Sequence, residues 1–334
     1  MYRRHGRITL EATRRAPGSS AIRALGGVDQ EHICGFRSEL QPIRALLKFD
    51  REDPNRKWFP MDLTQLTVTE VSPAYWRISF SNPPTNLQDP DTILEFQELV
   101  SRMESDDVLK VVVLESGNPD FFINRYDVSR AAETPVAPGP TGLPTWIDTT
   151  TRLAAVPVVS IAKIRGRNRG GGSEAGLAFD LRFASIEKAV FGQPEVGAGM
   201  FPGGGALERL PLFVGRARAL EIILGSDDLD AETAALYGWV NRALPDAQLD
   251  DFVDNLARRI ASFDKLALVE AKRLVNRRTV PSAEDLVETQ DAFLAAFAWP
   301  SLRERGARLR KRAGEVGPDF ELRFGHYMAD LPVE

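Results

Sequence analysis

The chain has few of the residues that build disulfide frameworks, catalytic triads and transition-metal sites. It carries one cysteine, Cys34, so no intrachain disulfide can form and secretion gains no support. Its three histidines, His5, His32 and His326, leave the long middle of the chain without any. That region therefore lacks the usual base of a Ser-His-Asp triad and the commonest transition-metal ligand. These absences exclude several classes of enzyme.

Long apolar runs and an excess of basic charge are also missing. No run of about 18 apolar residues occurs, so we expect no membrane span. The net charge of −5 argues against nucleic acid as the main partner, because phosphate binding requires a basic surface. With 334 residues, 43% of them hydrophobic, the chain can form one large or two ordinary domains. We expect a cytoplasmic protein.

Residues 1–60 differ in composition from the rest of the chain. The first 23 residues hold six arginines against one acid, Glu11, and show little periodicity. An Arg-rich, acid-poor start is typical of a transit peptide, but a disordered extension or a true start at Met61 explains it as well. We treat residues 1–60 as a disordered extension and base neither fold nor function on them.

From residue 66 the pattern becomes regular. Two β-rich runs, 66–71 and 74–80, flank a Ser-Pro pair that predicts a hairpin. A helix near Asp91, with apolar residues at helical spacing, follows. Further strands are predicted at 109–114, 157–163, 181–185 and 189–192, a helix at 146–155 and a proline-rich surface loop at 131–145. Beyond residue 205 the pattern is almost wholly helical. Strands that alternate with helices, followed by a helical tail, predict an α/β core at 61–262 and a helical region at 263–334.

The stretch at residues 164–195 carries the chemistry. A β-branched run leads into three consecutive glycines and then Glu174, and a second carboxylate, Glu195, closes the stretch after the letters FGQP. Glycines ahead of a helix let a backbone approach a ligand, and the free N–H groups at the helix start point at negative charge. Two glutamates bracketing such a turn can act as acid and base.

These motifs resemble the crotonase, or enoyl-CoA hydratase/isomerase, superfamily over roughly residues 65–275. Four elements match the family in order. They are the loop NPPTN (82–86), the loop FINRYD (122–127), the turn GGGSE (170–174), and FGQPE (191–195) followed by PGGG (202–205). The resemblance implies an α/β crotonase-like fold, of the ClpP/crotonase type, with a core of repeated β-β-α units and a helical C-terminal region.

The resemblance also implies a mechanism. The N–H groups of Asn124 and Gly171 would hold the thioester oxygen, Glu174 would activate water for attack at C3, and Glu195 would move the proton at C2. Retention of both carboxylates favours reversible hydration of a 2-enoyl-CoA. Isomerisation or hydrolysis of an acyl-CoA, or a catalytically silent binding protein, remain alternatives. The family implies no metal or redox cofactor, coenzyme A as part of the substrate, and homotrimers or hexamers.

Three arginines depart from the family pattern. Arg125 stands where a small glycine is common after the first oxyanion donor, and Arg167 and Arg169 precede the glycines in a segment that is commonly apolar. Three explanations are open. The arginines replace the cation near the coenzyme A phosphates, they bind a polar acyl group by forked hydrogen bonds, or they face solvent or a subunit contact. With Phe122 and Tyr126, they complete the predicted substrate-binding set.

Two other functions fit parts of the sequence. The spacing Gly170-x-Gly172-x-x-Ala175, with Glu195 about 20 residues on, also fits a relaxed dinucleotide fingerprint. The basic run at 303–312 allows RNA or protein binding, although such runs are usually solvated helix faces. The pair of glutamates distinguishes an enzyme from both, since a scaffold has no need to keep them together.

Overall fold

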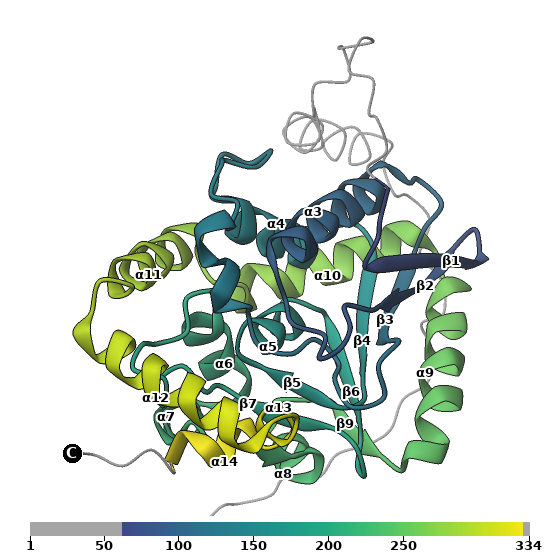
Figure 1. The fold of residues 1–334 in the computed structure, drawn as a ribbon. Coiled ribbons are helices and arrows are strands. Elements are labelled where there is room, and N and C mark those ends of the chain that lie inside the picture. The colour runs from purple at the N-terminus through teal and green to yellow at the C-terminus, as the bar shows by residue number, and fades with distance from the viewer. Residues whose placement is uncertain (1–61, 330–334) are drawn as a thin grey trace, which may run out of the picture. The chain divides into compact units, whose positions relative to one another are not determined.

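The computed structural model describes residues 62–329 (Figure 1). The predicted extension at residues 1–60 lies outside this range. The strands are β1 (Leu66–Ser72), β2 (Tyr75–Phe80), β3 (Val111–Ser116), β4 (Val159–Ile164), β5 (Arg167–Arg169), β6 (Leu181–Ser185), β7 (Val190–Gly192), β8 (Leu229–Asp230) and β9 (Arg242–Leu244). A six-stranded sheet has the order β1-β2-β3-β4-β6-β9, parallel except for the β1–β2 pair. A smaller sheet has the order β5-β7-β8.

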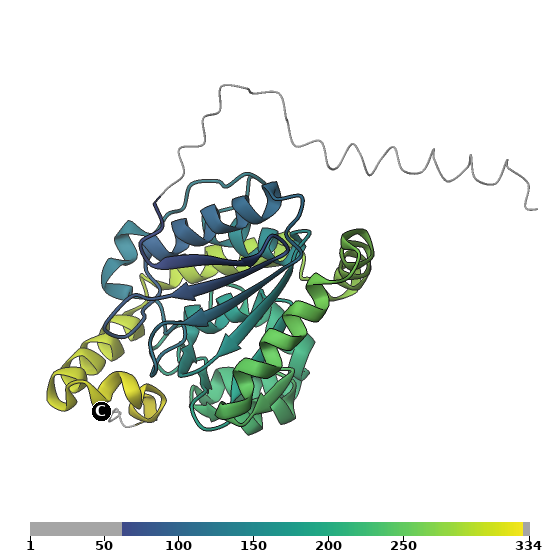
Figure 2. The same cartoon turned by 90° about the vertical axis from the view of Figure 1, so that its right-hand side faces the viewer.

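Helices connect and cover these strands. They are α3 (Pro90–Ser105), the 3-10 helix η1 (Val128–Glu133), α4 (Thr145–Ala155), α5 (Gly170–Leu177), α6 (Ala206–Val214), α7 (Arg216–Gly225), α8 (Ala231–Tyr237), α9 (Asp246–Ala261), α10 (Lys265–Thr279), α11 (Ala283–Ala296), α12 (Pro300–Val316), α13 (Asp319–Leu322) and α14 (Phe324–Ala329). Figure 2 shows the C-terminal helices α12–α14, in yellow, on the other side of the sheet from α9.

The main sheet is buried on both faces, and successive residues of a strand serve different cores. In β3, Val112 and Leu114 belong to the larger hydrophobic cluster, while Val111 and Val113 pack with α9. This alternation follows from the two-residue period of a strand. Strand β3 also contains few polar residues because both of its faces are covered. The sheet therefore forms a rigid base for the loops at its edge.

Most predicted elements are confirmed. The hairpin is the antiparallel β1–β2 pair, and apolar residues of α9 between 249 and 260 pack against the sheet. The expectation of an almost wholly helical chain after residue 205 is wrong in part, because β8 and β9 lie there. Both strands are too short to show a periodic pattern, and they are defined by their neighbours β7 and β6.

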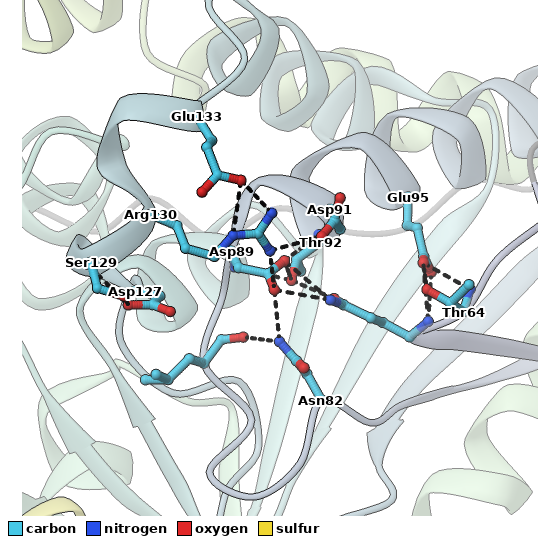
Figure 3. Close-up of polar contacts among 12 residues, drawn as sticks. Thr64, Asn82, Asp89, Asp91, Thr92, Glu95, Asp127, Ser129, Arg130 and Glu133 are labelled. Atoms are coloured by element: carbon cyan, nitrogen blue, oxygen red, sulfur yellow. Dashed lines mark hydrogen bonds and ion pairs between the residues drawn. The ribbon is translucent and has the colours of Figure 1, made fainter.

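The N-terminus of α3 is fixed by a polar network that also holds the preceding loop (Figure 3). Asp89 caps the helix by accepting from the Thr92 backbone at 2.8 Å and accepts from Asn82 at 3.1 Å. Arg130 of η1 reaches the carboxylates of Asp89 and Asp91, at 3.1 and 2.8 Å. Burial alone would raise the pKa of Asp89, but these hydrogen bonds lower it. The network ties η1 and the loop at 82–88 to α3.

Candidate active site

The first part of the candidate site is the loop at residues 122–127. The backbone N–H of Asn124 donates to the carbonyl of Asn86 at 2.8 Å. This geometry corrects the expectation for Asn124, because its N–H is committed inside the protein. Within residues 62–329, the N–H of Tyr126 has no hydrogen-bond partner. The N–H groups of Ile123 and Arg125 also lack a partner within residues 62–329, so Tyr126 supplies one available donor of this loop.

The second part is the glycine-rich start of α5. The first N–H groups of a helix have no partner within it, and that of Gly171 is one of these. A Cβ added to Gly171 would lie 2.2 Å from Oε1 of Gln88 and 3.4 Å from the Cβ of Tyr126, and one on Gly172 would lie 2.0 Å from the carbonyl of Ile123. Only glycine permits this approach. The donors Tyr126 and Gly171 consequently lie side by side.

Glu174 lies in the middle of α5 and is buried, with 5% of its surface exposed. Its Oε1 accepts from the backbone of Gly204 at 2.7 Å and of Ala206 at 3.2 Å. Burial raises the pKa of Glu174 to about 7, an effect that Glu208 reinforces and that the two N–H donors and Arg209 oppose. The side chain is thus held in place and can exchange a proton near neutral pH.

Glu195 lies just after β7, against the same glycine turn. Its Oε1 would be 2.6 Å from a Cβ on Gly170, and its buried Oε2 has no hydrogen-bond partner in the described part of the chain. Burial and the nearby carboxylate of Glu174 raise the pKa of Glu195 well above its ordinary value. The structure therefore brings the two predicted glutamates into one electrostatically linked pair.

Some residues that shape this pair were not predicted. Arg209 is buried behind Glu174, where it donates to the carbonyl of Gly204 at 3.3 Å and to Oγ1 of Thr150 at 3.2 Å. A Cβ on Gly204 would lie 2.4 Å from Oε2 of Glu174 and 2.6 Å from Nε1 of Trp146. The sequence PGGG at 202–205 indicates that the backbone packs closely against another part of the chain. It does not indicate that this part is the side chain of Glu174.

The two aromatic residues predicted to bind substrate differ in their surroundings. The side chain of Phe122 is fully buried in the larger hydrophobic cluster, so it supports the loop from beneath and does not face a ligand. Tyr126 is partly buried, and its hydroxyl lies 2.6 Å from Oγ1 of Thr134. The expectation for Phe122 is corrected, and Tyr126 stays at the site through its backbone.

The three arginines all contact the C-terminal helix α13. The guanidinium of Arg125 pairs with the carboxylate of Glu321 and lies 4.9 Å from the ring centre of Phe324. Arg167 donates to the carbonyl of Leu322 at 3.2 Å. These contacts are internal and the two side chains are only 19% and 23% exposed, which disfavours the solvent-facing alternative for Arg125 and Arg167.

Arg169 is fully buried and holds the same segment more firmly. It makes two bonds of 2.6 Å to the carboxylate of Asp228 and donates to the carbonyl of Glu321 at 2.7 Å. A forked guanidinium suits a carboxylate and two carbonyls at once. Arg169 therefore links the strand before α5 to α13, and it is committed within the chain instead of reading an acyl group.

The glycine turn that also fits the dinucleotide fingerprint packs closely against the rest of the chain. Protein atoms lie 2.0–2.6 Å from the positions of Cβ atoms added to Gly170, Gly171 and Gly172. The basic run predicted to bind a partner lies on α12, where Arg305 donates to the carbonyls of Gly197 and Met328. Part of that run therefore holds the chain to itself.

Among residues 62–329, no group of three or more His, Cys, Asp or Glu side chains could hold a metal ion. No helix in the same range is long and apolar enough to cross a membrane.

Comparisons with known proteins identify the family of the chain. The family model for enoyl-CoA hydratase/isomerase matches residues 71–304. The chain is 30% identical over 192 residues to the short-chain-enoyl-CoA hydratase of Clostridium acetobutylicum, covering 58% of this chain and 73% of that protein. It is 28% identical over 224 residues to the crotonyl-CoA hydratase of Syntrophomonas wolfei, covering 66% and 84%.

A solved structure extends the similarity to the fold. The crystal structure of a protein from Streptomyces avermitilis described as a "putative enoyl-CoA hydratase" matches with a TM-score of 0.77 and 35% identity, covering 82% of this chain and 99% of that one. The predicted crotonase-like α/β fold with C-terminal helices is confirmed. The chain belongs to the enoyl-CoA hydratase/isomerase (crotonase) family.

Proposed function

We propose that this protein catalyses the reversible hydration of a 2-enoyl-CoA thioester. The observation that carries the proposal is a pair of buried carboxylates, Glu174 and Glu195, next to two N–H groups, of Tyr126 and Gly171, that have no partner among residues 62–329. Hydration needs a base for water, an acid for carbon and a site for the developing enolate oxygen. Relatives with about 30% identity carry hydratase names.

The two N–H groups would bind the thioester oxygen as it gains negative charge. They come from different elements, the loop that holds Tyr126 and the helix start at Gly171, and glycine packing fixes them beside each other. Donors fixed where charge develops are worth about 3–4 kcal/mol each in acyl chemistry. The positive end of α5 adds to this stabilisation.

The surroundings of the two glutamates favour different protonation states. Glu174 accepts two backbone hydrogen bonds, which stabilise its ionised form, whereas Oε2 of Glu195 accepts none within the described residues. Near neutral pH the pair would share one proton, held by Glu195. Glu174 would then take a proton from a water molecule while the oxygen of that water bonds to C3. Glu195 would give its own proton to C2. Solvent exchange restores the starting state.

The direct test is the hydration of crotonyl-CoA. Loss of the enoyl absorbance, with 3-hydroxybutyryl-CoA as the product, is the expected result. Release of free coenzyme A would indicate a hydrolase, and conversion of a 3-enoyl-CoA without hydration would indicate an isomerase. Binding of acyl-CoA with no turnover of any of these substrates would favour a catalytically silent protein.

We also propose that the protein assembles as a homotrimer or hexamer. Large apolar side chains are exposed on the helical part of the described chain, and an interface would cover them. They include Leu224, Leu236, Leu266 and Val275, each more than 60% exposed. Light scattering on the purified protein should give a mass of three or six copies of the 37.0 kDa chain. A monomer at micromolar concentration would contradict this proposal.

A further inference from the structure

Arg125 is a cation placed next to the proposed proton-transfer residue. A Cβ on Gly170 would lie 2.6 Å from Oε1 of Glu195 and 3.4 Å from the Cβ of Arg125, so the two side chains flank the same glycine. The Oε2 atom of Glu195 is buried without a hydrogen-bond partner in residues 62–329. A long arginine side chain starting at this point could reach that oxygen. Such a pairing would stabilise the ionised carboxylate.

The guanidinium of Arg125 is instead held by the C-terminal segment. Its NH2 group pairs with Oε1 of Glu321, its NH1 group donates to the carbonyl of Tyr126 at 3.2 Å, and its Cζ lies 4.9 Å from the ring centre of Phe324. These three contacts direct it away from Glu195. Phe324 adds a cation–π interaction to the ion pair.

Glu321 is itself held in place. Its second carboxylate oxygen accepts from Nδ2 of Asn124 at 3.0 Å, so the carboxylate bridges two neighbouring residues of the loop at 122–127. Its backbone carbonyl accepts from Arg169 at 2.7 Å, and Arg169 is fixed by Asp228. The position of Glu321 is therefore determined by bonds from two separate elements of the core.

We propose that Glu321 is a positioning residue, a counter-ion that keeps Arg125 away from Glu195 and so leaves Glu195 able to carry the proton of the reaction. The proposal rests on the proposed function of Glu195. Without the carboxylate of Glu321, Arg125 would turn to Glu195 and hold it in the ionised form. The C-terminal segment thereby contributes a residue to the chemistry of a site built almost 150 residues earlier in the chain.

Several other charged side chains lie near Glu195. Glu174 faces it from α5, with Glu208 and Arg209 of α6 beyond, and Arg305 of α12 holds the carbonyl of Gly197 in the same turn. Arg209 and Arg305 bond to backbone carbonyls, whereas Arg125 pairs with a side chain, Glu321, that can be substituted without changing the backbone of the turn. A move of Arg125 from Glu321 to Glu195 can therefore be tested separately.

The first experiment compares crotonyl-CoA turnover in three variants. Glu321→Ala should lower kcat about tenfold or more, with little change in KM, and Glu321→Gln should have a smaller effect. The double variant Arg125→Met with Glu321→Ala should recover most of the lost activity, because no cation remains to capture Glu195. Glu315→Ala, which removes an exposed partner of Arg312 on α12, is the matched control and should match wild type.

Recovery of turnover in the double variant distinguishes a counter-ion from a residue with a purely structural role. A double variant as slow as Glu321→Ala would overturn the proposal, and so would full activity of Glu321→Ala. If Glu321→Ala fails to fold, the comparison of Glu321→Gln with its Arg125→Met double variant makes the same distinction.

A second measurement needs no turnover. The carboxyl of Glu195 can be titrated by NMR with isotope-labelled glutamate and assigned through Glu195→Gln. Its pKa should fall in Glu321→Ala and rise again in the double variant. An unchanged pKa would overturn the inference even in an active enzyme. A protein without hydratase activity that still shows these shifts would contradict the proposed function alone.

Discussion

Single glycines determine how closely the loop at 122–127 approaches α5. At Gly172 the nearest atoms to an added Cβ are backbone atoms of Ile123 and Asn124, at 2.0 and 2.4 Å, which cannot move aside as a side chain can. Gly172→Ala should therefore destabilise the fold by about 1–3 kcal/mol and reduce turnover. Urea unfolding and the crotonyl-CoA assay measure the two effects.

Gly314→Ala is the matched control for that substitution. Gly314 lies inside α12 with no atom within 4 Å of an added Cβ. Alanine there should stabilise the protein by about 0.5–1 kcal/mol, because glycine is the weaker helix former. Equal effects of the two substitutions would show that the close approach at Gly172 is not required.

The raised pKa of Glu174 predicts how stability varies with pH. Its folded-state pKa is about 7 against an ordinary value of 4.5, so in this interval the folded protein keeps a proton that the unfolded chain has released. Stability should then fall as the pH rises through the interval, by up to about 3 kcal/mol. Glu174→Gln should have a shallower decline. Parallel pH profiles of urea midpoints for the two proteins would contradict this.

At the scale of elements, one ion pair holds Arg169, the fully buried residue that bonds β5 to α13. Arg169 has no exposed surface, and Asp228 supplies its carboxylate partner. Asp228→Asn would leave a buried guanidinium without a compensating charge, which should cost about 3–5 kcal/mol of unfolding free energy.

An exposed pair gives the comparison. Glu270 and Arg273 on α10 are about half exposed. Glu270→Gln should therefore leave stability almost unchanged, because an exposed ion pair is screened by solvent. A similar loss in both variants would mean that burial does not set the strength of the Arg169–Asp228 pair.

For the whole molecule, the sequence predicted those features that depend on local patterns. The helices, most strands and the glycine turn follow from periodicity and from residue types with special backbone freedom. The two glutamates follow from their positions on either side of the glycine turn, and the family resemblance implies the role of each. The short strands β8 and β9 were missed because they exist only through pairing with distant strands.

Contacts across long sequence separations explain the remaining errors. No local signal connects Arg125 with Glu321, or Arg169 with Asp228. The donor at Asn124 was also misassigned, because only the folded loop shows that its N–H is bonded to Asn86 and that of Tyr126 is free within the described chain.

The measurement that tests the account most directly is crotonyl-CoA hydration by wild type, Glu174→Gln and Glu195→Gln. Each substitution keeps the size of the side chain and removes its ability to exchange a proton. Turnover should fall by about 100-fold or more in each variant, while acyl-CoA binding is retained. Normal hydration by either variant would contradict a mechanism in which both glutamates transfer protons.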